Sequence, residues 1–364
     1  MKKSLFTLLA IILLFGCKPD SYKISGTTDI AALNGKQIVI KDRINNEWVT
    51  IDSAKIENGT FAFKGEADSS RIAYLILEMP SGEAIHQPFV IENGNITAKI
   101  DEKAILVSGT QQNDLLQQYS DKKKQISADA EKTYNQLTDT SLTEQQKHDI
   151  ENKLKNFEAE WTNTDIEYAT THVNTIVGSY IFSSSYYNMD LAQKEKIVGL
   201  MNAVTKNQEQ IKSIIGAMEI EKNTTTGQKY TDITLPSIDG KNLSLSSLIG
   251  QTDYVLVDFW ASWCGPCIQS MPDVKALYEK NKGKKLEILG VSLDEDENAW
   301  KAAISKHGLN WKHISDLSGW TSAGAKLYAI NAIPATVLIN KNGIIEGRNL
   351  SIQEIENIIS KSIE

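Results

Sequence analysis

The chain has 364 residues, of which 41% are hydrophobic, and a formal net charge of −8. This acidic balance argues against a nucleic-acid partner, because binding to phosphates requires clusters of lysine and arginine. The length and the apolar content are sufficient for two or three domains, each with a core of its own.

The N-terminus has the features of an export signal. Two lysines supply positive charge, residues 5–15 form an apolar segment, and a glycine precedes Cys17. The apolar segment is too short for a bilayer, which takes about 20 residues. The pattern resembles a bacterial lipoprotein signal, in which residues 1–16 are removed and Cys17 carries lipid. The resemblance implies a membrane-anchored protein of the bacterial cell envelope that faces the periplasm; the alternative is an uncleaved, buried helix.

Residues 22–108 predict an antiparallel β-sandwich of about seven short strands. Apolar runs such as 37–40 and 73–77 alternate there with turn signals of the Asn-Gly and Ser-Gly type. No catalytic constellation is evident in this segment, and we interpret the solitary His86 as a surface or core residue.

Residues 111–222 predict a helical region, because proline is absent and apolar residues recur at helical spacing. A capping-box pattern that begins at Ser141 predicts the start of the longest helix, with an apolar stripe through Trp161. We interpret the lysine run at 122–124 as a solvated helix face. We expect residues 22–222 as a whole to dock a partner or to form a homodimer through the 141–172 helix.

Residues 228–364 have the pattern of an α/β domain, which a polar linker at 223–228 precedes. A hairpin is predicted at 235–245, with its turn at Asp239-Gly240. Strands are then expected at 254–260, 286–293 and 335–340, and helices around 267–281, 297–307 and 321–328.

The strongest functional signal is the pentapeptide Trp263-Cys264-Gly265-Pro266-Cys267. It lies between an expected strand and an expected helix, so its two thiols can close and reopen a disulfide at a helix N-terminus. The helix dipole and the unpaired N–H groups favour the thiolate of Cys264, and Cys267 is the resolving thiol. No cation lies between the sulfurs, so we expect a reducing pair. This disulfide is the redox group, and no further cofactor is expected.

Asp258 is the candidate base for the resolving thiol. Burial within an apolar strand raises the pKa of a carboxyl towards the range useful for proton transfer. The alternative role is a hydrogen bond to a loop. A competing interpretation of the cysteine pair is half of a zinc site completed by His307 and His313, but these histidines lie far downstream and no metal is expected.

The segment 258–267 resembles the active-site segment of thioredoxin, including the acid six residues before the first cysteine. Ile333-Pro334-Ala335-Thr336 resembles the thioredoxin cis-proline loop. The resemblance implies a thioredoxin-like fold in which this loop lies against the disulfide and offers backbone hydrogen bonds to the substrate. The implied substrate-binding residues are Trp263, Gly265, Pro266, Ile333 and Pro334.

The separation between Cys267 and Pro334 is longer than in plain thioredoxin. The additional residues, about 294–319, resemble the inserted unit of membrane-anchored TlpA/ResA-type oxidoreductases. Two further motifs are Ile51-Asp52-Ser53-Ala54 and Asn58-Gly59-Thr60-Phe61-Ala62-Phe63. On these, the first 220 residues resemble more weakly the domain of unknown function that often precedes such modules in Bacteroidota envelope lipoproteins. The resemblance implies an extracytoplasmic thiol-disulfide oxidoreductase that reduces envelope proteins and is recharged by an unidentified membrane thiol reductant. Ser270 stands where ResA-like members often have a glutamate, which assigns proton transfer to the aspartate and weakens the case for apocytochrome c as substrate.

Two alternatives remain open. A thiol peroxidase of the peroxiredoxin type shares the thioredoxin fold, but its motif Pro-x-x-x-Thr-x-x-Cys would need proline and threonine where this chain has Val257 and Ala261. An envelope binding or assembly protein with secondary redox activity is the other alternative.

Overall fold

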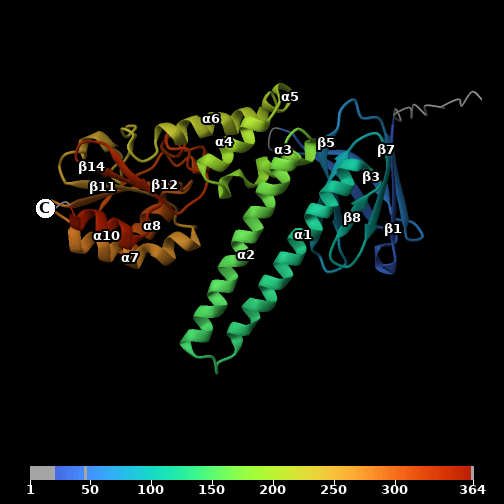
Figure 1. Ribbon diagram of the computed structural model, residues 1–364, viewed down its shortest axis with the longest axis horizontal. Coiled ribbons are helices and arrows are strands. Elements are labelled where there is room, and N and C mark those ends of the chain that lie inside the picture. The colour runs from blue at the N-terminus through green and yellow to red at the C-terminus, as the bar shows by residue number, and fades with distance from the viewer. Residues whose placement is uncertain (1–20, 45–46, 362–364) are drawn as a thin grey trace, which may run out of the picture. The chain divides into compact units, whose positions relative to one another are not determined.

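The computed structural model describes residues 21–44 and 47–361, and the chain divides into two compact units, Met1–Phe182 and Ser183–Glu364 (Figure 1). The expected signal peptide and its Cys17 lie outside the described residues. Within the described ranges, no helix is both long enough and apolar enough to cross a membrane.

The first unit begins with two four-stranded sheets, ordered β4-β1-β7-β8 and β3-β2-β5-β6. The strands are β1 (Tyr22–Thr28), β2 (Gln37–Ile44), β3 (Glu47–Lys55), β4 (Thr60–Gly65), β5 (Arg71–Glu78), β6 (Ala84–Ile91), β7 (Gly94–Ile100) and β8 (Ile105–Ser108). Every second residue of β1 is buried, as in a strand with one face on a core. Ile24 of one sheet and Leu75 of the other belong to the same buried cluster. The predicted β-sandwich is confirmed.

The sandwich differs from the prediction in strand number and in one pairing. Within the sandwich the described residues form eight strands, and β1 pairs with β7 in parallel, with Tyr22 opposite Gly94. A parallel pair requires a long connection, which the intervening strands supply here. Local turn signals could not reveal this pairing. His86 is exposed on β6, where its ring lies 5.8 Å from that of Trp48.

Two long helices follow, α1 (Gln111–Tyr134) and α2 (Glu144–Thr171). The expectation of a long second helix is confirmed, but its N-cap is Thr143, which forms a capping box with Gln146. Ser141 does not cap the helix, because its N–H and hydroxyl both donate to the carboxylate of Asp139 in the preceding turn.

One lysine of the 122–124 run is buried between these helices, so the interpretation as a solvated face is wrong for Lys123. Its Nζ lies 2.5 Å from the carboxylate of Asp165 and 3.6 Å from the centroid of the Trp161 ring. The hydroxyl of Tyr119 donates to the same carboxylate at 2.7 Å. Helical spacing turns one of three consecutive side chains towards the neighbouring helix.

The second unit contains a five-stranded sheet in the order β13-β12-β11-β14-β15. Its strands are β11 (Tyr254–Trp260), β12 (Leu286–Ser292), β13 (Lys312–Ile314), β14 (Ala335–Asn340) and β15 (Ile345–Arg348). The helices that follow β11 in the chain are α7 (Gly265–Asn281), α8 (Glu297–His307), α9 (Ala323–Leu327) and α10 (Ile352–Lys361). The central strand β11 runs parallel to β12 and antiparallel to β14. The predicted hairpin is β9 (Thr234–Pro236) with β10 (Asn242–Ser244).

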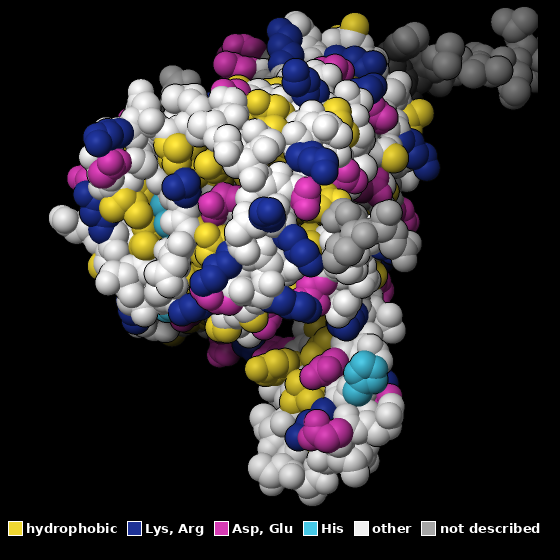
Figure 2. Space-filling model, turned by 90° about the vertical axis from the view of Figure 1, so that its left-hand side faces the viewer, with side chains coloured by type: hydrophobic (Ala, Val, Ile, Leu, Met, Phe, Trp, Pro, Cys, Tyr) yellow, Lys and Arg dark blue, Asp and Glu magenta, His cyan; other side chains and the backbone are white. Residues whose placement is uncertain are grey.

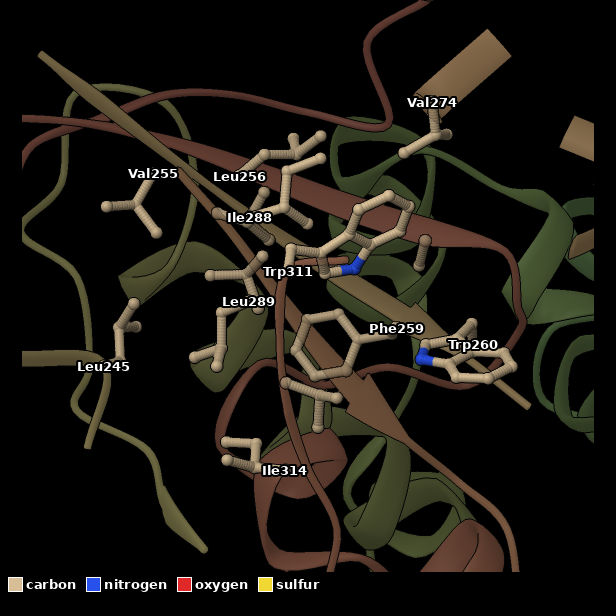
Figure 3. Close-up of a cluster of buried hydrophobic side chains, with 14 of the residues drawn as sticks. Leu245, Val255, Leu256, Phe259, Trp260, Val274, Ile288, Leu289, Trp311 and Ile314 are labelled. Atoms are coloured by element: carbon tan, nitrogen blue, oxygen red, sulfur yellow. The ribbon is translucent and has the colours of Figure 1, made fainter. Parts of the chain in front are cut away.

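The central strand presents its residues alternately to two sides of the sheet (Figure 3). The ring of Trp260 connects through two buried aromatic rings to Tyr278 of α7. Phe259 contacts Tyr328 instead. Because successive strand residues face opposite sides, Asp258 projects to the same side as Trp260, the side that α7 covers.

The shorter helices of the middle region are α3 (Ile176–Ser185), α4 (Leu191–Leu200), α5 (Ala203–Lys206) and α6 (Glu209–Asn223). The linker expected after them is fixed to the sheet. The guanidinium of Arg348 on β15 donates to the hydroxyl of Thr224 at 2.6 Å and also to its carbonyl. The N–H of Gly227 donates to the carbonyl of Ile345.

Charged side chains of both signs are interspersed over the face of the molecule in Figure 2. Among the described residues drawn there, no extended basic area is visible, in keeping with the net charge of −8.

Candidate active site

The cysteine pair lies at the N-terminus of α7, directly after the central strand β11. Cys264 is the N-cap of the helix, and the N–H of Cys267 donates to its sulfur at 3.2 Å. Pro266 in the first turn costs no hydrogen bond, because the first N–H groups of a helix have no intrahelical partner. The first sulfur therefore has an N–H donor and the positive end of a helix dipole, both of which favour a thiolate.

Cys264 and Cys267 form a disulfide, with their Cα atoms 5.3 Å apart. Both residues are nearly buried, with exposed fractions of 4% and 2%. Their neighbours Trp263, Gly265 and Pro266 are exposed. The exposed surface at the cysteine pair is therefore formed mainly by these neighbours, and Cys264 is the more exposed of the two cysteines.

The second sequence motif lies against the first. The Ile333–Pro334 peptide bond is cis, and the carbonyl oxygen of Ile333 lies 3.8 Å from the sulfur of Cys264. Pairing of β11 with β14 brings the motifs together, with Phe259 opposite Ala335. The contact that the thioredoxin resemblance implied is present.

Asp258 lies within β11, opposite Gly290 of β12 and Thr336 of β14. The residue keeps some exposed surface, but the protein packed around its carboxyl desolvates it and raises its pKa to about 7. Desolvation is the cause of this shift, without a contribution from a neighbouring charge. A carboxyl with such a pKa can accept and return a proton near neutral pH.

Asp294 is a residue of the site whose role the sequence analysis missed. It follows β12 and is almost fully buried. Its carboxylate accepts hydrogen bonds from the N–H and the hydroxyl of Ser262 and from the hydroxyl of Ser292. Ser262 lies two residues before Cys264, so this carboxylate fixes the turn between β11 and α7. Its position at the carboxyl end of a parallel strand was the available signal, because such ends share one edge of a sheet.

Two other positions considered in the sequence make local contacts. Ser270, in the place of the ResA-type glutamate, donates its hydroxyl to the carbonyl of Cys267 at 2.9 Å. His313 is buried beside Trp260, and this burial lowers its pKa to about 4. Among the residues that the structure describes, no three or more potential metal ligands gather in one place.

Trp263 and Trp320 line two hollows, and Cys264 lines one of them. The first, of about 400 Å³, is lined by Tyr187, Trp263, Cys264, Gly265, Pro266, Trp320, Asn331, Ala332 and Ile333. The second, of about 380 Å³, is lined by Ser262, Trp263, Leu293, Asp294, Glu295, Asp296, Ala299, Gly319 and Trp320. The sequence analysis did not assign Tyr187 or Trp320 to the site, since both come from segments remote in sequence.

These features define a class of protein. A disulfide-forming Cys-x-x-Cys pair begins a helix after the central strand of a mixed sheet, and a cis-proline loop lies against it. This is the arrangement of a thioredoxin-like thiol-disulfide oxidoreductase.

Comparison with known proteins agrees with this class. The sequence profile of the AhpC/TSA family matches residues 226–348, and that of a domain of unknown function (DUF4369) matches residues 22–116. The chain is 30% identical over 132 residues to the thiol-disulfide oxidoreductase ResA of Bacillus thuringiensis (strain Al Hakam), which is 36% of this chain and 73% of that protein. It is 37% identical over 109 residues to ResA of Oceanobacillus iheyensis, which is 30% of this chain and 54% of that protein.

Among solved structures, a thiol-disulfide oxidoreductase from Bacteroides fragilis is 33% identical, with a TM-score of 0.35, and the match covers 37% of this chain and 98% of that one. The sequence relatives are sufficient to assign the family. The chain belongs to the ResA-type thiol-disulfide oxidoreductases, and its C-terminal thioredoxin-like domain is an oxidoreductase. The DUF4369 match covers the β-sandwich and the start of α1, and its description assigns no activity to them.

Proposed function

We propose that this oxidoreductase reduces disulfides of envelope proteins outside the cytoplasm, while lipid on Cys17 anchors it to a membrane. The observation that carries the reducing role is the environment of Cys264. Its sulfur receives one N–H donor at a helix N-terminus, and the two residues between the cysteines, Gly265 and Pro266, bring no cation. A thiolate that is stabilised only moderately belongs to a reducing pair, because strong stabilisation of the reduced form makes a disulfide oxidising.

The proposed reaction has two steps. The thiolate of Cys264 attacks one sulfur of the substrate disulfide, a mixed disulfide forms, and the other substrate cysteine leaves as a thiolate. Asp258 then accepts the proton of Cys267, whose thiolate attacks the sulfur of Cys264 and releases the second substrate cysteine. Two electrons have then passed to the substrate, and the protein holds the disulfide of this structure.

Each turnover leaves the pair oxidised, so a thiol donor must reduce it again. We propose a membrane protein with a reactive dithiol as this donor. On the substrate side, the backbone of Ile333 beside cis-Pro334 would pair with the bound chain, and Trp263, Gly265 and Pro266 would form the facing wall. Trp263, Gly265, Pro266 and Ile333 line the hollow that also contains Cys264, and Pro334 follows Ile333 through a cis peptide bond.

A disulfide-reduction assay tests the reaction. The mature chain, supplied with a chemical reductant, should reduce a disulfide-bonded protein, and Cys264→Ser should abolish this turnover. Cys17→Ser is the matched control, because it removes the third cysteine and leaves the pair intact. Wild-type turnover by Cys264→Ser would refute the assignment, and a reduction potential well above about −150 mV would reverse the proposed direction.

Fractionation of expressing cells tests the anchor. The wild-type protein should sediment with membranes, and Cys17→Ser should be released from them. Membrane association that is equal in both proteins would exclude lipid on Cys17 as the cause.

The AhpC/TSA match favours a thiol peroxidase as a second candidate function. The peroxiredoxin motif positions peroxide with a threonine hydroxyl, and the corresponding Ala261 has none. We therefore expect consumption of hydrogen peroxide to be slow compared with disulfide reduction. A faster reaction with peroxide would make the peroxidase the principal activity.

We also propose a homodimer through α2. Trp161 of this helix is 37% exposed, although its ring contacts Lys123. Sedimentation of the full chain should then give twice the monomer mass, and a monomer at high protein concentration would exclude the dimer.

A further inference from the structure

Two tryptophans are exposed next to the disulfide. Trp263 precedes Cys264 and is 54% exposed, and Trp320 lies in a short turn after β13 and is 48% exposed. Their ring centroids are 6.1 Å apart and the rings are inclined by 56°. Such large apolar side chains normally cover part of a core, so a neighbouring exposed pair marks a surface that contacts another molecule.

The tryptophan pair borders two hollows at once. On one side lies the hollow that contains Cys264 and Ile333. On the other lies the hollow whose wall includes the segment from Leu293 to Asp296. A polypeptide with its cysteine at Cys264 therefore has neighbouring side chains within reach of the second hollow.

The second hollow is acidic. Of the nine residues that line it, all in the described part of the chain, three carry carboxylates and none carries a positive charge. Asp294 is buried, and its hydrogen bonds to Ser262 and Ser292 hold it in the wall. Glu295 and Asp296 are exposed, and among the described residues no lysine, arginine or histidine forms an ion pair with either.

Local structure holds these two acids beside the tryptophans. The carboxylate of Glu295 lies against the backbone of Gly319, where a Cβ atom would collide with it. Gly319 has a φ of 54°, a conformation that glycine adopts readily, and it directly precedes Trp320. Asp296 is the N-cap of α8 and accepts hydrogen bonds from the first N–H groups of that helix.

We propose that the hollow between Trp263, Trp320, Glu295 and Asp296 binds a lysine or arginine side chain of the polypeptide substrate, near the cysteine that Cys264 attacks. This inference rests on the proposed reduction of polypeptide disulfides. A tryptophan face attracts a cation within about 6 Å of its centroid, and partial desolvation strengthens the attraction. The carboxylates of Glu295 and Asp296, for which the described residues provide no ion-pair partner, attract the same charge. The aliphatic part of a lysine or arginine side chain packs on the tryptophan rings. An apolar side chain would pack on the rings but would not be attracted by the carboxylates.

Matched peptides test this preference. Each peptide holds one cysteine in a mixed disulfide with thionitrobenzoate, and the positions beside the cysteine carry lysine, norleucine or glutamate. Attack by Cys264 on the peptide sulfur releases coloured thionitrobenzoate, so the second-order rate constant of the reduced full-length protein is measured directly. We expect the lysine peptide to react about tenfold faster than the glutamate peptide at low salt, with norleucine between them. High salt should reduce the difference.

Variants locate the effect. Trp320→Ala and Glu295→Gln should each bring the ratio of the lysine to the norleucine rate constants close to one. Glu295→Gln keeps the side-chain length that packs on Gly319. Glu297→Gln is the control, because Glu297 directly follows Asp296 in the chain but pairs with Lys301 at 2.7 Å. This variant should keep the wild-type ratio of the lysine to the norleucine rate constants.

The norleucine peptide separates this inference from the proposed function. If it reacts and the reaction depends on Cys264, the thiol chemistry holds whatever the peptide preference. Equal rate constants for the lysine and norleucine peptides with the wild-type protein would then overturn the cation subsite alone. A lysine preference that survives in both Trp320→Ala and Glu295→Gln would overturn it as well.

Discussion

Ser262 and Asp294 connect the active-site turn to the chain that follows β12. The N–H of Ser262 donates to both carboxylate oxygens at 3.1 Å, and its hydroxyl donates to one of them. The carboxylate is buried, so these hydrogen bonds operate at low dielectric. The turn that presents Cys264 is therefore held by a residue 32 positions after Ser262 in the sequence.

Asp294→Asn should destabilise the protein. Asparagine keeps one acceptor oxygen and brings an amide that meets the N–H of Ser262, so at least one buried donor loses its partner. The expected loss is about 2–3 kcal/mol in the free energy of unfolding. Urea unfolding followed by tryptophan fluorescence measures it. Asp253→Asn is the control, because its ion pair with Lys341 is exposed and is worth less than about 1 kcal/mol. Equal midpoints for the two variants would contradict the role of Asp294.

Asp258→Asn should stabilise the oxidised protein in a pH-dependent way. The pKa of Asp258 is about 7 in the folded protein and 3.8 in an unperturbed aspartate. Between these values the unfolded chain releases the proton and the folded protein keeps it, so wild-type stability falls as the pH rises and levels off above about 7. Ionisation of this carboxyl in the folded protein therefore lowers the free energy of unfolding by at most about 4 kcal/mol.

Urea midpoints at about pH 4 and about pH 8 measure this effect. The two proteins should be equally stable at the lower pH, and Asp258→Asn should be the more stable at the higher pH. A stability difference that does not change with pH would mean that the carboxyl of Asp258 is not desolvated.

The same substitution should slow the second chemical step. Without a carboxylate to accept the proton of Cys267, the mixed disulfide should persist and its release should slow by about a hundredfold or more. Acid quenching and mass spectrometry measure this intermediate. In the wild-type protein, release should accelerate as the pH rises to about 7, because Asp258 must be ionised to act as base. Unchanged release in Asp258→Asn would assign the proton to another acceptor.

The pattern of the sequence was sufficient to predict the redox pair and its supporting elements. An apolar strand, a Cys-x-x-Cys segment and a helical repeat are local signals, so β11 and α7 follow from them. The carboxyl of Asp258 also stood out, because an acid within an apolar run has few neutral explanations. The apposition of Pro334 required the family resemblance, since no local pattern joins two segments that far apart.

The rest depends on contacts that sequence periodicity does not encode. Trp320 reads as an isolated aromatic residue in a polar segment, and only the fold brings its ring beside Trp263. Lys123 reads as one of three solvated lysines, yet it faces α2. For Lys123 the local pattern predicted a helix, and tertiary packing decided which side of that helix is covered.

Lys123→Met should destabilise the first unit, because it leaves the carboxylate of Asp165 buried without its cation. Breaking a buried ion pair in this way costs about 3–5 kcal/mol. Burial lowers the pKa of Lys123, and the hydrogen bond and charge of Asp165 counteract this shift. Thermal unfolding followed by far-ultraviolet circular dichroism measures the loss of stability, because the helical signal of α1 and α2 disappears when the first unit unfolds.

Two variants complete this test. Lys122→Met removes an adjacent lysine whose pair with Glu167 is exposed, and it should change stability by less than about 1 kcal/mol. The double variant Lys123→Met with Asp165→Leu removes both buried charges and should recover most of the stability. Equal losses for Lys122→Met and Lys123→Met would show that the buried pair contributes nothing particular.

Arg348→Met should expose the segment between α6 and β9 to proteolysis. In the wild-type protein the guanidinium donates to the hydroxyl of Thr224 and to the carbonyl of Tyr328 at 2.7 Å, so it fixes this segment to the sheet. Loss of hydrogen bonds from a charged donor should raise the open population, and with it the cleavage rate near Lys222 and Lys229, by about tenfold. Limited trypsin digestion with mass spectrometry identifies the sites. Arg71→Met is the control, because it removes an ion pair with Asp42 in the β-sandwich. It should leave cleavage of the segment between α6 and β9 unchanged. Equal cleavage in wild type and Arg348→Met would mean that other contacts fix this segment.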